Sequence, residues 1–181
     1  MGNLLDKLHN DHVNFIKLLT FIERQLNCIK ECEVVDIEKI LFSVKYMKDY
    51  PDAIHHPLEN IVFTYFLEHY DYCCDEIIEL MQEHEEMPLL TETVINMLQC
   101  VLSEQPIGRK ELCDKLSIYI EIQKAHMNHE ESKIYPVLYE IMKDEDWQGL
   151  DKTLNVSNDP LFDVPRNEDF QSLYETITAA M

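Results

Sequence analysis

Apolar residues recur at intervals of three and four along most of the chain, which is the period of one face of an α-helix. The first stripe falls in residues 3–28 and includes one histidine among its positions: Leu5, Leu8, His12, Phe15, Leu19 and Ile22. Stripes of the same period cover residues 36–70, 73–103 and 109–143. A Gln105-Pro106-Ile107-Gly108 turn separates the last two. The pattern therefore predicts four long helices.

Prolines interrupt three of these stripes. Pro51 and Pro57 lie in the second, Pro88 in the third and Pro136 in the fourth. Proline lacks an amide donor, and its ring clashes with the preceding turn, so each position should bend its helix. We predict one kinked helix over the second stripe rather than two separate elements, and a kink beside His84, four residues before Pro88.

Long helices joined by short connections predict an all-α, up-down-up-down four-helix bundle. We assign residues 1–146 to this bundle. After Trp147 and Gly149 the composition changes, and a last short helical run is expected near 167–179. Residues 147–181 are therefore predicted to form a C-terminal extension that packs on the bundle or on a partner.

Charge narrows the classes of partner. The formal net charge is -20, and so acidic a surface repels nucleic-acid phosphates and anionic lipid headgroups. The chain has no stretch of 18 apolar residues and does not open with the basic and apolar segments of a secretory signal. We therefore expect no nucleic acid and no membrane as partners, a cytoplasmic location, and free thiols at the six cysteines.

Each predicted helix carries a histidine on its apolar face, where a buried imidazole needs a hydrogen-bond partner or a metal. In two helices a glutamate follows four residues later, one turn along the same face. A carboxylate can bridge two cations, and a set of nitrogen and oxygen ligands suits iron or manganese better than copper. We therefore predict a dinuclear metal site. Its expected ligands are His12, His55, Glu59, His84, His126 and Glu130.

The segments around these ligands, in this order, resemble hemerythrin-like domains of bacterial type, also called HHE cation-binding domains, over about residues 5–143. The segments are Asn10-Asp11-His12, His55-His56-Pro57-Leu58-Glu59, Glu83-His84-Glu85 and His126-Met127-Asn128-His129-Glu130-Glu131. The resemblance implies a hemerythrin-like bundle and a non-haem diiron centre, two iron ions that an oxo or hydroxo group can bridge. Asn158-Asp159-Pro160-Leu161-Phe162 is similar to a tail of some bacterial members.

The chain departs from the oxygen-carrying members of this family. Pro88 stands where those proteins place a second histidine of the third helix, and Glu130 stands near the position of their aspartate. The set of four histidines and two glutamates is closer to that of the iron-sulfur-centre repair proteins. These departures argue against reversible oxygen transport.

Three functions remain open. The preferred one binds or reduces a small oxidant (oxygen, peroxide or nitric oxide) for sensing or stress protection. The alternative is iron handling, such as storage, sensing or repair of iron-sulfur centres. The least favoured is a structural bundle without metal. Whether the protein is an enzyme is left open, and its expected partners are a small diatomic or peroxide ligand and, as one option, a second copy in a homodimer.

Several neighbours of the ligands are assigned lesser roles. His56 follows His55 directly, so it points about 100° away around the helix, and a supporting or surface role is preferred over ligation. His129 is kept as a less favoured competitor of Glu130. For two carboxylates, Glu83 and Glu131, solvent exposure is the preferred interpretation, and a hydrogen bond to a ligating imidazole is the alternative. The tyrosines, Tyr135 among them, are expected to serve packing.

Overall fold

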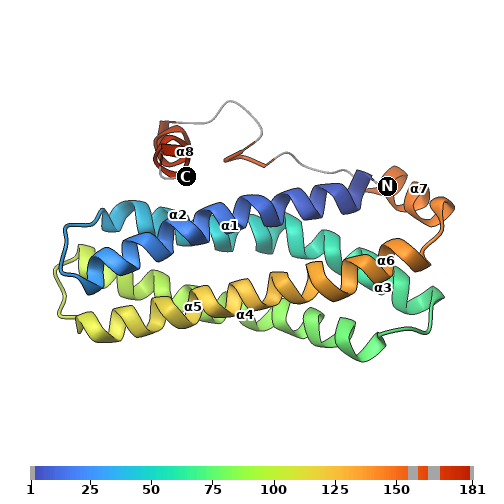
Figure 1. Cartoon of the computed structure of the whole chain (residues 1–181), viewed down its shortest axis with the longest axis horizontal. Helices are drawn as coiled ribbons and strands as arrows, with labels where there is room; N and C mark the ends of the chain where they lie inside the picture. The colour runs from blue at the N-terminus through green and yellow to red at the C-terminus, as the bar shows by residue number, and fades with distance from the viewer. Residues whose placement is uncertain (1–2, 155–158, 163–167, 180–181) are drawn as a thin grey trace.

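The computed structural model describes residues 3–154, 159–162 and 168–179, and within these residues it is helical and contains no strand. Four long helical runs lie side by side (Figure 1). They are α1 (Asn3–Lys30); α2 (Ile37–Tyr50) continuing through η1 (Pro51–His55) into α3 (His56–His69); α4 (Cys74–Leu102); and α5 (Arg109–His129) continuing through η2 (Glu130–Ile134) into α6 (Tyr135–Ile141). The predicted all-α bundle is confirmed. None of the helices in the described ranges combines the length and apolarity that a membrane crossing needs.

Two prolines widen the helices in which they lie. Just before Pro57, the amide of His56 donates to the carbonyl of Pro51, and just before Pro136, the amide of Tyr135 donates to that of Glu130. Both bonds span five residues, which is the π-helical spacing. A wider turn makes room for the proline ring, which would clash with the carbonyl four residues earlier. The predicted bends therefore take the form of the π-turns η1 and η2.

The π-turns adjoin the two histidine–glutamate pairs. η1 ends at His55 and η2 begins at Glu130. The second run is continuous from Ile37 to His69, as predicted. Pro88, by contrast, lies inside α4, which stays α-helical from end to end.

The interior consists of two apolar clusters with a polar layer between them. The larger cluster is formed by α2, α5, the C-terminal halves of α1 and α4, Leu161 and the α8 helix (Glu168–Ala179). The smaller one is formed by α3, the end of η2, α6, the N-terminal ends of α1 and α4, and the α7 helix (Asp144–Thr153). On α1, for example, Leu8 belongs to the smaller cluster, Phe15 to the larger, and His12 lies between them. Apolar packing on both sides therefore holds the polar layer at one level of the bundle.

The C-terminal part packs on the bundle in two places. Near the N-terminus, α7 (Asp144–Thr153) contacts α1. The carboxylate of Asp151 accepts a hydrogen bond of 3.1 Å from the amide of Leu4. Further along, α8 (Glu168–Ala179) lies across α1 and α2 (Figure 1). Residue 146 lies inside α7, so no helix boundary marks the predicted division between bundle and extension. That division stays a prediction.

Asp159 anchors the segment before α8. Its side chain is fully buried and accepts hydrogen bonds from the Tyr46 hydroxyl at 2.6 Å and from the amides of Leu161 and Phe162 at 2.8 and 3.0 Å. The Leu161 side chain is fully buried in the larger cluster. The tail motif named from sequence is thus a docking segment from Asp159 onward, while Asn158 lies outside the described residues.

Replacing Asp159 by asparagine should loosen the docking of α8. Hydrogen bonds to a charged acceptor contribute about 1.5–3 kcal/mol each, and an amide supplies only one neutral oxygen for these donors. We expect amide hydrogen exchange in residues 168–179 to become at least about tenfold faster, since about 1.4 kcal/mol corresponds to a factor of ten. Exposed Asp144 on α7, changed in the same way, is the control. Unchanged exchange in α8 of the Asp159 variant would contradict this role.

Candidate metal centre

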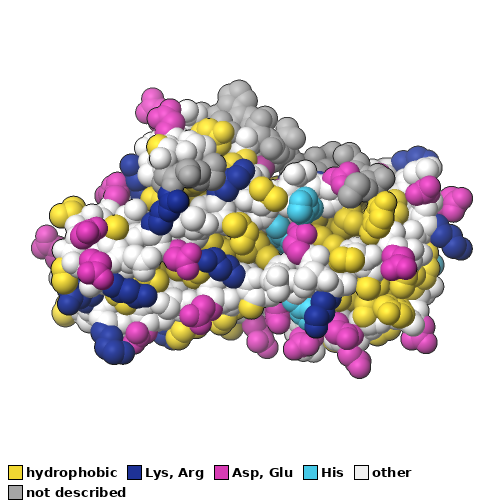
Figure 2. All heavy atoms as spheres, viewed as in Figure 1, with side chains coloured by type: hydrophobic (Ala, Val, Ile, Leu, Met, Phe, Trp, Pro, Cys, Tyr) yellow, Lys and Arg dark blue, Asp and Glu magenta, His cyan; other side chains and the backbone are white. Residues whose placement is uncertain are grey.

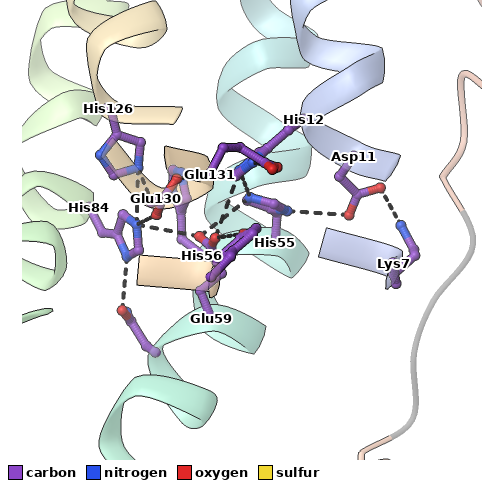
Figure 3. A network of polar contacts seen from close by, with 12 residues as sticks. Lys7, Asp11, His12, His55, His56, Glu59, His84, His126, Glu130 and Glu131 are labelled. Atoms are coloured by element: carbon purple, nitrogen blue, oxygen red, sulfur yellow. Dashed lines mark hydrogen bonds and ion pairs between the residues drawn. The ribbon is translucent and has the colours of Figure 1, made fainter. Parts of the chain in front are cut away.

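All six predicted ligands meet in the polar layer between the two apolar clusters (Figure 3). α1 contributes His12, the run α2–η1–α3 contributes His55 and Glu59, α4 contributes His84, and the run α5–η2–α6 contributes His126 and Glu130. The two glutamates are fully buried, and none of the four histidines is more than 6% exposed. Histidine side chains also reach the surface near the middle of one face, beside acidic side chains (Figure 2).

The four imidazoles form two pairs that face each other through their Nε2 atoms. The Nε2 atoms of His12 and His55 lie 2.9 Å apart, and those of His84 and His126 lie 3.2 Å apart. Two uncharged nitrogen lone pairs at such distances repel each other unless a proton or a cation lies between them. Each pair is therefore suited to hold a positive charge.

The carboxylate of Glu59 spans the two pairs. Its Oε2 atom lies 3.3 Å from Nε2 of His55 and 3.4 Å from Nε2 of His84. Its Oε1 atom lies 3.8 Å from Nε2 of His12 and accepts a short hydrogen bond from the Tyr135 hydroxyl. Glu59 thus contacts both histidines of the His12–His55 pair and only His84 of the other pair.

Glu130 makes the complementary set of contacts. Its Oε1 atom lies 3.4 Å from Nε2 of His84 and 3.3 Å from Nε2 of His126. Its Oε2 atom lies 3.4 Å from Nε2 of His12. Two carboxylates between two imidazole pairs are the arrangement that a pair of bridged cations requires.

The outer nitrogens of the four rings are each held by an oxygen of a neighbouring helix. The Nδ1 atom of His12 lies 2.8 Å from Glu131, that of His55 lies 3.3 Å from Asp11, that of His84 lies 2.8 Å from Asn60 and that of His126 lies 2.6 Å from Glu83. An oxygen acceptor at Nδ1 selects the tautomer whose Nε2 carries a lone pair. This is the usual support of a metal-binding histidine.

These outer contacts run once around the bundle. Each acceptor is adjacent in sequence to one ligand but serves a ligand on the next helix. Asp11, beside His12, contacts His55; Asn60, beside Glu59, contacts His84. Glu83, beside His84, contacts His126, and Glu131, beside Glu130, returns to His12. The orientation of every ring therefore depends on two helices.

Burial makes this layer unfavourable for bare charges. Desolvation raises the pKa of Glu59 to about 8 and that of Glu130 well above its ordinary value. Desolvation also lowers the pKa of His84 to about 2 and that of His55 well below its ordinary value. The carboxyls are thus driven to keep protons and the imidazoles to stay neutral.

Unpaired oxygens in the same layer fit a cation. Oε2 of Glu59 and Oε2 of Glu130 are buried and have no hydrogen-bond partner. A buried carboxylate oxygen without a donor is costly. Positive ions bound between the carboxylates and the neutral Nε2 atoms would satisfy both. The donor set and its geometry therefore fit a metal pair.

Three residues of the layer differ from the preferred interpretation of the sequence, and burial excludes one of the two roles kept open for His56. Glu83 and Glu131, expected in solvent, are only 37% and 31% exposed and hold ligand imidazoles. Tyr135, expected to serve packing, is buried, stacks on His12 and donates to Glu59. His56, placed in a supporting or surface role, is buried with its ring 4.3 Å from that of His84. Packing between helices, which periodicity does not describe, causes these differences.

Two supporting residues, Asp11 and Asn60, were not singled out from sequence. The sequence places both beside a predicted ligand, because Asp11 precedes His12 and Asn60 follows Glu59. Adjacency alone, however, points a side chain about 100° away from its neighbour on the same helix. Only the next helix shows what it contacts.

The remaining histidines lie outside the layer. His129 is partly exposed and lines a cavity of about 570 Å³ between α4 and α5, together with Glu83 and His126. His9 is exposed with its Nδ1 atom 3.0 Å from Glu131. It lines a smaller cavity of about 250 Å³ that Tyr135 and Glu131 also border. Each of the two cavities is therefore bordered by residues that contact ligands of the layer.

Comparison with known proteins supports one family. A family model described as the hemerythrin HHE cation binding domain matches residues 3–138. This range contains all six predicted ligands and the four residues that hold their outer nitrogens. No curated protein and no solved structure matches the chain.

Proposed function

Because the chain belongs to the hemerythrin HHE cation-binding family, we propose that it holds two non-haem iron ions in this layer. The proposed ligands are His12, His55, Glu59, His84, His126 and Glu130. We further propose that the centre binds or reduces a small oxidant, such as oxygen, peroxide or nitric oxide, for sensing or stress protection.

The observation that carries the proposal is the placement of two buried carboxylates between two imidazole pairs. Glu59 and Glu130 each contact histidines of both pairs at 3.3–3.8 Å. A single cation would need only one end of this arrangement. Two cations would be held by both carboxylates, and Oε2 of each carboxylate has no hydrogen-bond partner.

The chain's own groups orient and insulate such a centre. When bound, the iron pair supplies electrons and open coordination positions for a small oxidant. The four outer acceptors fix the tautomer and angle of the imidazoles. The Tyr135 hydroxyl holds Glu59 by its Oε1 atom. Apolar side chains of the two clusters keep bulk water away on both sides.

Iron loading with spectroscopy tests the proposal. Metal-free full-length protein is loaded anaerobically with ferrous iron and freed of excess, and the bound iron is counted. We expect two ions per chain and new charge-transfer absorption after addition of oxygen, peroxide or nitric oxide. The matched pair of variants is His84→Ala, which should lose iron, and His69→Ala, an exposed histidine whose loss should change nothing. Absence of bound iron in the unaltered protein would refute the proposal.

Iron handling is the alternative use of the same ligands. It predicts labile iron that leaves to a chelator or to an apo iron-sulfur protein within the time of an assay. Retention of both ions against a chelator, together with the response to oxidants, favours the oxidant function. Rapid loss without such a response favours iron handling.

A further inference from the structure

His56 is a fifth histidine of the buried layer and has no place among the six ligands. It begins α3, directly after His55, and is 8% exposed. Its Nδ1 atom is buried and has no hydrogen-bond partner. The Asp52 carboxylate, one turn earlier, lies 3.7 Å away, which is beyond a normal hydrogen bond. A buried imidazole in this condition is uncommon and needs an explanation.

The other four imidazoles of the layer differ from His56 in one respect. Each has its Nδ1 atom held by an oxygen at 2.6–3.3 Å. Those rings are therefore fixed in angle. No comparable bond fixes the ring of His56, so it is the imidazole of the layer that can turn.

The surroundings of His56 define which end of the layer it serves. Its ring lies 4.3 Å from that of His84, nearly parallel at 12°, and 5.9 Å from that of His126. One ring nitrogen from each of these three residues lies within 4.8 Å of the others. The stack is compatible with the metal-free layer. Two imidazoles that bind one metal must both point a nitrogen at it, which parallel stacked rings do not do.

We propose that His56 turns out of its stack on His84 and binds the metal at the His84–His126 end of the layer. The inference rests on the proposed two-metal site and adds a seventh ligand to it. Its buried Nδ1 atom has no partner to give up when the ring turns. On turning, the Nδ1 atom can take Asp52 as its acceptor, which repeats the pattern of the other rings.

The proposal gives the two metals unequal surroundings. The His84–His126 end gains a third imidazole, whereas the His12–His55 end keeps two. Glu59 and Glu130 remain shared between them. The His12–His55 end, with fewer protein ligands, would therefore be the end that a small oxidant reaches. Tyr135, which stacks on His12 and donates to Glu59, lies beside that end.

The test replaces His56 by phenylalanine in the full-length protein. Phenylalanine keeps a flat ring of similar size in the stack and removes both nitrogens. Ferrous iron and, separately, cobalt(II) are titrated anaerobically into the metal-free proteins. We expect the unaltered protein to bind two ions, and the variant to bind one with unchanged affinity and the second at least about tenfold more weakly, because even supporting residues of a metal site are worth about 10–100-fold. Mössbauer spectra of iron-loaded unaltered protein should show two distinct iron sites.

Two controls separate the outcomes. His69→Phe alters an exposed histidine away from the layer and should leave both affinities unchanged. The melting temperature of metal-free His56→Phe should equal or exceed that of the unaltered protein, because an unpartnered imidazole is removed. If the phenylalanine variant does not fold, the His56→Gln variant is used in its place. Two ions bound with unchanged affinity in the variant would overturn the role of His56 alone. No ions bound in the unaltered protein would overturn the two-metal site itself.

Discussion

The Glu130→Gln variant is expected to lose the metal pair while keeping its fold. Glu130 contacts three of the four histidines through its two oxygens, so its loss affects both ends of the layer. Glutamine has the same shape but offers one neutral oxygen and cannot bridge two cations. Loss of a supporting residue already costs about 10–100-fold in metal affinity, so we expect a decrease of more than about 100-fold. Iron counted after anaerobic loading and desalting measures it.

The same substitution should not destabilise the metal-free protein. Burial raises the pKa of Glu130 well above its ordinary value, and its Oε2 atom has no partner. A glutamine amide can donate to the imidazole lone pairs instead. We therefore expect an equal or higher melting temperature without metal. Exposed Glu140 on α6, changed to glutamine, is the control and should leave iron content unchanged. Retention of both ions by Glu130→Gln would contradict the bridging role.

Metal removal should make the stability of the protein depend on pH in a way that the loaded form does not. Burial raises the pKa of Glu59 from 4.5 to about 8. Between these values the folded metal-free protein keeps a proton that the unfolded chain releases, so stability falls as pH rises. Burial lowers the pKa of His55 and His84 below 6.5. Those groups oppose the effect only below 6.5, where the unfolded chain takes up protons that the folded one does not.

Between pH 6.5 and 8 the effect of the Glu59 carboxyl is therefore not opposed by the two histidines. Across about 1.5 pH units, one such carboxyl costs about 2 kcal/mol. Bound metal takes the place of the proton on the carboxyl, which removes this pH-dependent loss of stability. Metal binding also stabilises the folded state by about 4 kcal/mol per site at a free metal concentration of about 1,000 times the dissociation constant. Melting temperatures at pH 6.5 and 8, with chelator and with ferrous iron, measure both effects. A total near 8 kcal/mol for two sites corresponds to a rise of about 16–32 °C in a chain of this size.

The Glu59→Gln variant supplies the control for this pH effect. It lacks the titrating carboxyl, so the decrease between pH 6.5 and 8 should shrink in the metal-free form. Parallel pH curves for the metal-free and iron-loaded unaltered protein would show that the buried carboxyls are not where the metal binds.

Periodicity was sufficient to predict the helices and the level of the candidate ligands. The stripe in α1 places Leu8, His12 and Phe15 on one face because side chains three and four apart share a face. The spacing of His55 and Glu59 by four residues likewise brings both side chains to one height. The same local rule worked on α4 and α5, where His84 and His126 are buried as predicted.

The prolines show where local rules end. Pro57 and Pro136 share a pattern with Pro88, since each interrupts an apolar stripe. Two of the three produce a π-turn and one lies in an unbroken helix. The loss of one amide donor is the same in all cases. The sequence pattern alone therefore does not distinguish the proline that lies in a regular α-helix from the two that follow a π-turn.

The amino-acid sequence by itself determined that this protein is an all-α bundle and which side of each helix carries the histidines and glutamates, because the helical period relates neighbours on one chain segment. Only the tertiary structure decided what each ring nitrogen contacts. Asp11 serves His55, Asn60 serves His84 and Glu83 serves His126, whereas His56 stacks on His84 with its Nδ1 atom unpartnered. These contacts join different helices, and they depend on the rotation and axial stagger of each helix against the next, which packing of the whole core sets.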